Sequence, residues 1–135
     1  MHKHIVAIVG LVALAVASGA SAEEKTMNLS RNATSGADSL LAYAGRWDRD
    51  CKELPIKVNF TKQPAHGTAW SVETDRVIPT STPAMGSTGK CAGKSVTSKK
   101  IMYRSAPGFR GSDTVGYVSE GGGTVIRTTI AVTVQ

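Results

Sequence analysis

Few side chains of this 135-residue chain are of the types that perform covalent or metal chemistry. They are Cys51, Cys91 and His66, the one histidine that lies beyond residue 4. A structural zinc site takes four such ligands, and a catalytic thiol needs a nearby base. Here the cysteines stand 40 positions apart (91 minus 51), and no Cys-x-x-Cys pair occurs. The simplest chemistry is one disulfide between Cys51 and Cys91, which would contribute roughly 4 kcal/mol in an exported chain.

Catalysis by other groups is not indicated either. The sequence contains neither Gly-x-Ser-x-Gly nor His-Glu-x-x-His, and no pair of carboxylates is placed in an evident pocket. General acid–base catalysis requires paired titratable groups that are held together. We therefore expect a protein that is not an enzyme and that uses no cofactor and no metal ion.

The first 22 residues have the layout of a secretory signal peptide. A short basic start precedes the apolar run Ile5–Val16, and Ala20-Ser21-Ala22 forms a small-x-small cleavage site. A membrane anchor is the alternative, but the apolar run is shorter than the about 20 residues that a span needs. We expect a mature chain that begins at Glu23, has no transmembrane segment, and resides in the periplasm or outside the cell.

The charge of the mature chain indicates no particular partner. Loss of Lys3 leaves 15 basic and 10 acidic residues, a net charge of +5. Such an excess could favour anionic partners, but the basic residues are scattered between Lys25 and Arg127 without a long run. No aromatic ladder or helix-turn-helix pattern accompanies them, so we expect no nucleic-acid binding.

The strongest structural signal is alternation of apolar and polar residues near the C-terminus. Thr124–Val134 places five side chains on one face, and Lys99–Arg104 and Asp113–Ser119 alternate as well. Pro55–Lys62 also alternates strictly, and Gly67–Thr74 is expected to return beside it as a hairpin partner after a Pro-Gly turn. These short strands predict an all-β sandwich of about seven strands.

Other segments are less regular. Glu23–Asp38 is polar and lacks periodicity, so we expect a flexible leader (residues 23–38) before a domain that spans residues 39–135. Ser39–Trp47 fits either a short strand or one helical turn. Thr80–Ser98 is long for a loop, and the disulfide at Cys91 would restrain it.

The bend between two of the predicted strands resembles a known family. The pattern is Tyr103-x3-Pro107-Gly108-Phe109-x-Gly111-x-Asp113-x-Val115-x-Tyr117, followed by Ile130-x-Val132-x-Val134. It resembles the bacterial immunoglobulin-like, cadherin-like module, and Pro64-Ala65-His66-Gly67-Thr68 resembles an earlier hairpin turn of that module. With its two cysteines, the chain looks like small exported single-domain proteins of alphaproteobacterial type. The resemblance covers about residues 51–135 and implies an immunoglobulin-like β-sandwich.

The resemblance also implies structural roles for four residues of the motif. Phe109 would plug the end of the core, Gly111 would take a positive φ, and Asp113 would accept bonds from backbone amides of the bend. Tyr117 could act as a corner tyrosine. The chain departs from most such modules in having one copy instead of an array, and it lacks the clustered acidic residues of cadherin calcium sites.

The orientation of Trp70 differs between two interpretations. Alternation within Thr68–Val72 places Trp70 and Val72 on the apolar face, whereas the family register turns Ala69 and Ser71 toward the core. We expect Trp70 to be buried, because an exposed indole without a partner is unfavourable.

The function that these features favour is binding by an exported module, to a protein or a glycan at the cell envelope. An envelope structural or assembly protein, or a small inhibitor of a secreted enzyme, is the alternative. No feature of the sequence indicates an oligomeric state. The candidate contact residues, each of which could equally be packed or simply solvated, are Trp47, His66, Trp70, Arg104 and Arg110.

Overall fold

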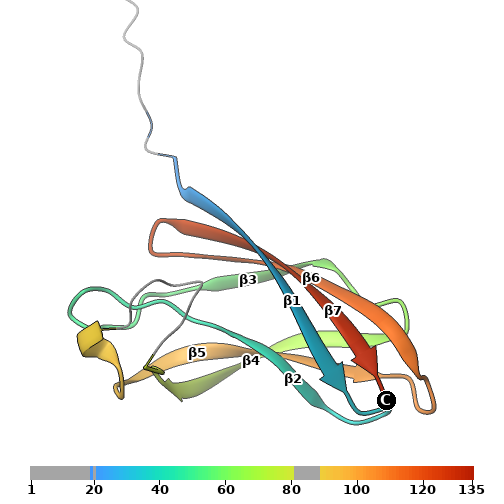
Figure 1. Cartoon of the computed structure of the whole chain (residues 1–135). Coiled ribbons are helices and arrows are strands. Elements are labelled where there is room, and N and C mark those ends of the chain that lie inside the picture. The colour runs from blue at the N-terminus through green and yellow to red at the C-terminus, as the bar shows by residue number, and fades with distance from the viewer. Residues whose placement is uncertain (1–18, 20, 81–88) are drawn as a thin grey trace, which may run out of the picture.

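The computed structural model describes residue 19, residues 21–80 and residues 89–135, and these residues form a β-sandwich (Figure 1). One sheet has the strand order β1-β7-β6-β3 and the other the order β2-β5-β4. The fold class predicted from sequence is confirmed. The strands are β1 (Glu23–Ala33), β2 (Ser39–Ala44), β3 (Lys57–Lys62), β4 (Gly67–Val77), β5 (Ser95–Ser105), β6 (Gly111–Gly121) and β7 (Thr124–Val134).

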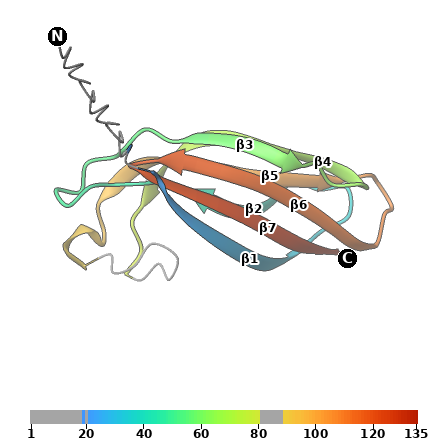
Figure 2. The ribbon, with the colours of Figure 1, turned by 90° about the horizontal axis from the view of Figure 1, so that it is seen from above.

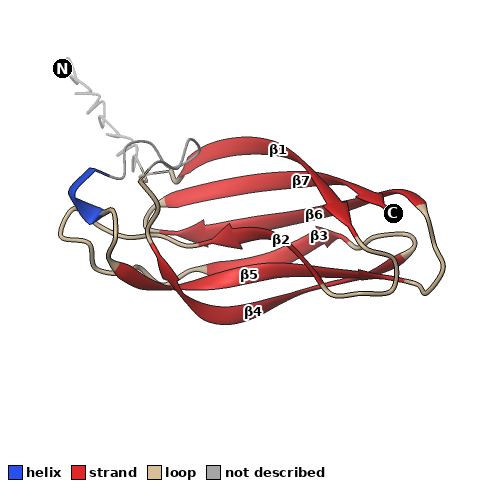
Figure 3. Ribbon diagram, turned by 60° about the horizontal axis from the view of Figure 1, so that its bottom comes forward, coloured by secondary structure: helices blue, strands red, loops and turns tan. Residues whose placement is uncertain are grey.

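Helical structure in the described residues is limited to one 3₁₀ turn, η2 (Gly89–Cys91), drawn in blue in Figure 3. None of the described residues belongs to a helix long and apolar enough to cross a membrane. The predicted signal peptide falls almost wholly outside the described residues.

The core forms where the inner faces of the two sheets meet. β7 alternates as predicted, with Ile126, Thr128, Ile130, Val132 and Val134 buried and the residues between them exposed. Ile101 and Tyr103 of β5 are fully buried, as the sequence predicted, and Val115 and Tyr117 of β6 lie opposite them. Alternation therefore identified the inner face of the last three strands correctly.

The first strand corrects the expectation of a flexible leader over residues 23–38. Glu23–Ala33 forms β1, which pairs in parallel with β7 along its whole length, from Glu23 opposite Thr124 to Ala33 opposite Val134. Figures 1 and 2 both show β1 beside β7. Leu29 packs against the core, so the sandwich begins at residue 23 and not at residue 39.

The pairing of β3 and β4 also differs from the predicted hairpin. β3 pairs with β6, and β4 pairs with β5, so the turn at residues 63–66 connects the two sheets. Within Ser39–Trp47, for which a strand and a helical turn were both open, Ser39–Ala44 is the edge strand β2. Local turn chemistry predicted the reversal of the chain, but the partner of each strand depends on packing between distant segments.

The predicted disulfide between Cys51 and Cys91 is confirmed, with the two Cα atoms 5.3 Å apart. It lies beside a second apolar cluster, separate from the main core, in which Ile78, Cys91 and Val96 are buried. Trp47 packs against this cluster. Part of the predicted long loop, residues 81–88, lies outside the described residues.

Candidate functional site

The side chain of Asp113 connects three segments at one end of the sandwich. Its carboxylate is buried and accepts hydrogen bonds from the backbone N–H groups of Ala65 (2.9 Å) and His66 (3.1 Å). The Tyr103 hydroxyl also donates to it (2.8 Å). The sequence predicted that Asp113 binds backbone amides, but these amides belong to the turn before β4 and not to its own bend. Desolvation of the hydroxyl raises the pKa of Tyr103, and the hydrogen bond to Asp113 raises it further.

The bend before β6 has the backbone geometry that the motif implied. Gly111 has φ +137°, a conformation that favours glycine. Phe109 is half-buried and packs against the main core, so it covers the end of the core without being enclosed by it. Its ring stacks on that of His66, with centroids 4.2 Å apart and planes at 11°. His66, a candidate contact residue, is therefore part of this stacked end of the sandwich.

Tyr117 is a core residue of β6. It is 3% exposed, and its ring lies 6.2 Å from that of Phe60. Burial raises the pKa of its hydroxyl. The suggested corner-tyrosine role stays a prediction.

The outer face of the sheet β2-β5-β4 displays apolar side chains in two rows. Leu40 and Trp70 both pair with Met102, and Tyr43 and Val72 both pair with Lys100. Residues that pair directly across antiparallel strands stand on the same face. We call this surface the sheet-face patch; its members are Leu40, Tyr43, Trp70, Val72 and Met102.

Trp70 stands on this outer face, so the expectation that it points into the core is wrong. Its neighbour Ala69 is 4% exposed and pairs with the fully buried Tyr103. Val72, expected to be buried with Trp70, is instead 45% exposed, and Trp70 itself is half-buried. The register that the family resemblance implied for these two positions is the one observed.

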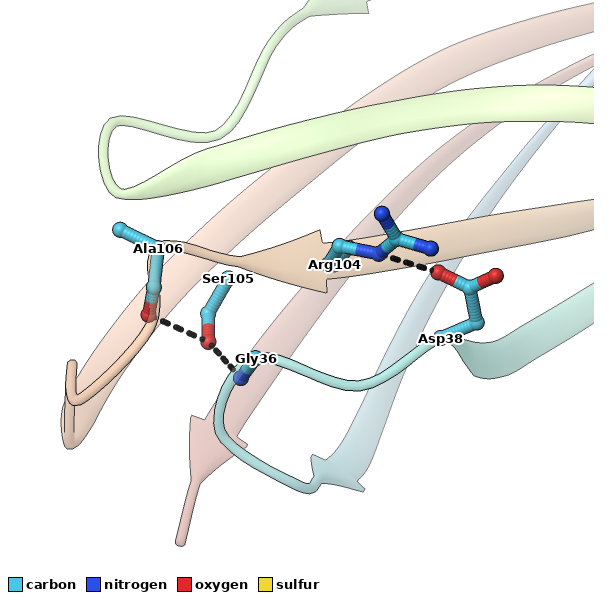
Figure 4. A network of polar contacts seen from close by, with 5 residues as sticks. All are labelled: Gly36, Asp38, Arg104, Ser105 and Ala106. Carbon is cyan, nitrogen blue, oxygen red and sulfur yellow. Dashed lines mark hydrogen bonds and ion pairs between the residues drawn. The ribbon is translucent and has the colours of Figure 1, made fainter.

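A shallow hollow beside Trp70 brings two of the candidate contact residues together. It measures about 460 Å³ and is lined by both Trp70 and Arg104. Arg104 is exposed and forms an ion pair with Asp38 (Nε to Oδ1, 2.6 Å), which raises the pKa of its guanidinium. Figure 4 shows this pair beside the Gly36 N–H, which donates to Ser105 Oγ (2.9 Å). These contacts attach the chain before β2 to the end of β5.

The other candidate contact residues lie elsewhere. Trp47 is packed beside the disulfide, and Arg110 is exposed in the bend before β6. Of the five candidates, the structure therefore brings only Trp70 and Arg104 into one place.

Sequence reasoning missed two exposed apolar residues of the sheet-face patch, Leu40 and Tyr43. Leu40 is 42% exposed and Tyr43 is 36% exposed. The ring of Tyr43 lies under the guanidinium carbon of Arg76, 4.3 Å from its centroid. Regular alternation could not identify them, because the register shifts between Leu40 and Ala42 and buries Leu41.

Nothing in the described part of the chain resembles a metal centre. Among residues 21–80 and 89–135, no three His, Cys, Asp or Glu side chains come together in a way that could hold an ion. Both cysteines are in the disulfide.

No family model, curated protein or solved structure matches this chain.

Proposed function

We propose that this chain is an exported, non-catalytic binding module that recognises a protein of the cell envelope through the sheet-face patch. The observation that supports the proposal is the row formed by Leu40, Met102 and Trp70 across all three strands of one sheet. Aromatic and methionine side chains are enriched at protein interfaces, and a contiguous exposed apolar surface commonly marks one.

The charges around the patch indicate the chemistry of the partner. Lys100 lies within the patch, between Tyr43 and Val72, and Arg76 stands over the ring of Tyr43. A partner surface with an apolar centre and acidic residues at its rim would complement this arrangement. Such complementarity mainly affects the association rate and the choice of partner.

Export and an immunoglobulin-like identity are parts of the same proposal. A disulfide is typical of oxidising compartments, and β1 begins at Glu23, the first residue after the proposed signal peptide. The orders β2-β5-β4 and β7-β6-β3 match the central strands of immunoglobulin sandwiches, which supports a cadherin-like module of this class. The periplasm or the cell exterior is the proposed location.

The test is capture of a partner from an envelope extract, with variants of the two outer sheet faces. Val72→Glu and Trp70→Ala should abolish capture of a stoichiometric protein. Thr129→Glu adds the same charge as Val72→Glu on an exposed position of β7 in the other sheet, and it should leave capture intact. Capture that persists in both patch variants would contradict the proposal.

A glycan ligand is the second candidate, because the hollow beside Trp70 combines an indole with the Arg104–Asp38 pair. Sugars commonly stack on such rings. Binding on a glycan array that Trp70→Ala abolishes and Val72→Glu leaves unchanged would favour adhesion to a glycan over protein recognition.

A further inference from the structure

A groove of about 520 Å³ opens between β1 and β2, which are edge strands of their respective sheets. β1 and residues 40–47 form its walls, and side chains of β6 and β7 form its floor. Clefts that bind small molecules usually enclose about 300–1,000 Å³. The groove therefore has the size of a small-molecule site. Leu40 and Tyr43 of the sheet-face patch stand on its rim, whereas Trp70, Val72 and Met102 do not line it.

The middle of the groove is apolar. Met27 and Leu29 are the half-buried residues on the inner side of β1, at the level of Thr128 and Ile130 of β7. Leu41, which is 1% exposed, lines the opposite wall. A hydrocarbon chain placed here would exchange water for apolar contacts along the groove.

Every charged residue among the described residues that line the groove is an arginine. They include Arg31, Arg46 and Arg76, and no aspartate or glutamate is among them. Arg46 is 7% exposed; its Nη1 donates to the Gly45 carbonyl (2.8 Å) and its Nη2 to Ser119 Oγ (3.2 Å), so its partners in the described residues are neutral oxygen atoms. Arg31 reaches across the groove, and its Nε donates to the Leu41 carbonyl (2.7 Å).

Two of these arginines lie at opposite ends of the apolar stretch. Ser119, which Arg46 contacts, pairs with Ile126, whereas Arg31 pairs with Val132. Six positions of β7 separate these levels (132 minus 126), which corresponds to about 20 Å along a strand. The groove is therefore elongated, with one buried guanidinium at one end and an exposed one at the other.

The buried guanidinium favours an anion. Burial lowers the pKa of Arg46, because its charged form loses hydration. A carboxylate beside it would offset that loss through a charge-assisted pair. An extended peptide is less well suited, because Arg31 already occupies the Leu41 carbonyl on the free edge of β2.

We propose that this groove binds a long-chain carboxylate, with the acyl chain along Met27 and Leu29 and the carboxylate at Arg46. Binding of this ligand is a second activity that does not depend on Trp70, Val72 or Met102, the patch members that lie outside the groove. Both the acyl chain and the carboxylate of the ligand contribute to the affinity, so an amphiphile with a cationic head group should bind poorly.

The experiment is a calorimetric titration of the purified, disulfide-bonded protein with dodecanoate, repeated with dodecyltrimethylammonium. Dodecanoate should bind with one-to-one stoichiometry, and the cationic analogue should bind more than about tenfold more weakly. Met27→Glu places a negative charge in the groove and should weaken dodecanoate binding by a similar factor. Thr26→Glu adds the same charge on the adjacent, exposed position of β1 and should leave the affinity unchanged.

Arg46→Lys retains the charge but loses the planar fork, so it should weaken dodecanoate binding less than Arg46→Met does. If Arg46→Met does not fold, the comparison of Met27→Glu with Thr26→Glu still decides the question. Equal binding of the two amphiphiles, or weakening by Val72→Glu instead of Met27→Glu, would overturn the proposal. So would an acidic extended peptide that binds at the β2 edge while dodecanoate does not.

Discussion

Asp113 and Tyr103 form a buried pair whose energetics can be tested through pH. Asp113 is 6% exposed and Tyr103 is fully buried, so the hydrogen bond from the tyrosine hydroxyl to the carboxylate is shielded from water. Hydrogen bonds to charged groups contribute about 1.5–3 kcal/mol. The pair therefore fixes β5 to β6, and the bonds of Asp113 to Ala65 and His66 add the turn before β4.

We predict that Tyr103→Phe lowers the free energy of unfolding by about 1.5–3 kcal/mol at neutral pH. The pKa of Tyr103 is raised in the folded state, so its contribution is complete below its ordinary value of about 10 and is lost as the pH rises above it. The difference between the wild type and the variant should therefore shrink in alkaline solution. Denaturant titrations over a pH series measure this difference.

A difference between the two proteins that stays constant into alkaline solution would contradict the folded-state shift of Tyr103. Tyr117 provides a comparison, because burial alone raises its pKa without a carboxylate partner. Tyr117→Phe should also reduce the loss of unfolding free energy in alkaline solution. It should lower the free energy of unfolding at neutral pH by less than Tyr103→Phe does.

At the scale of single residues, the sequence predicted the role of a side chain better than the segment that the side chain contacts. The positive φ of Gly111 and the amide-binding role of Asp113 were implied by the resemblance of the bend to a known motif, and both are observed. The identity of the turn that Asp113 binds was not implied, because Ala65 is 48 positions away and reaches it only through the pairing of the sheets. The direction of Trp70 was missed because the larger apolar residues of this part of β4, Trp70 and Val72, stand on the outer face, whereas the small Ala69 is the buried one.

At the scale of elements, β1 is the main feature that local sequence did not reveal. Its inner side carries only Met27 and Leu29 as large apolar residues, followed by Arg31. With so few apolar residues on its inner side β1 alternates weakly, and its partner β7 is about 100 positions away. A strand whose stability depends on such a distant partner cannot be identified from a local window.

We predict that the β1 amides that bond to β7 are protected from hydrogen exchange, which a flexible leader would not show; the amides on the free edge of β1 should exchange faster. Leu29→Ala should lower this protection and reduce the free energy of unfolding. The loss should be smaller than the about 2–5 kcal/mol found for fully buried leucines, because Leu29 is half-buried. Asn28→Ala is the matched control, since Asn28 is exposed on the other side of the strand. Rapid exchange throughout residues 23–33 in the wild type would show that β1 does not pair in solution.

At the scale of the whole molecule, two separate apolar clusters stabilise the fold. The main core lies between the sheets, whereas the second cluster includes Val96, five positions before the core residue Ile101. Because the register of β5 with β4 is continuous, alternation places Val96 on the outer face of the sheet. The disulfide and Trp47 thus cover one end of that outer face, and the sheet-face patch lies further along it.

This division predicts how the protein responds to loss of the disulfide. Cys51→Ser/Cys91→Ser should lower the free energy of unfolding by about 4 kcal/mol, the value that chain entropy gives for a loop of 40 residues. The variant should nevertheless stay folded, because the main core contains neither cysteine. Its denaturant m-value should rise, since the unfolded chain without the cross-link exposes more surface.

Hydrogen-exchange measurements should show that the double-serine variant loses protection mainly at the second cluster. Amides near Ile78 and Val96 should become less protected in the double-serine variant, whereas amides near Ile130 should change only with the global stability. Val96→Ala is the matched comparison, because it weakens the same cluster while keeping the cross-link. Collapse of all protection in the double-serine variant, with retention in Val96→Ala, would mean that the bond maintains the whole sandwich and that the two clusters are one cooperative unit.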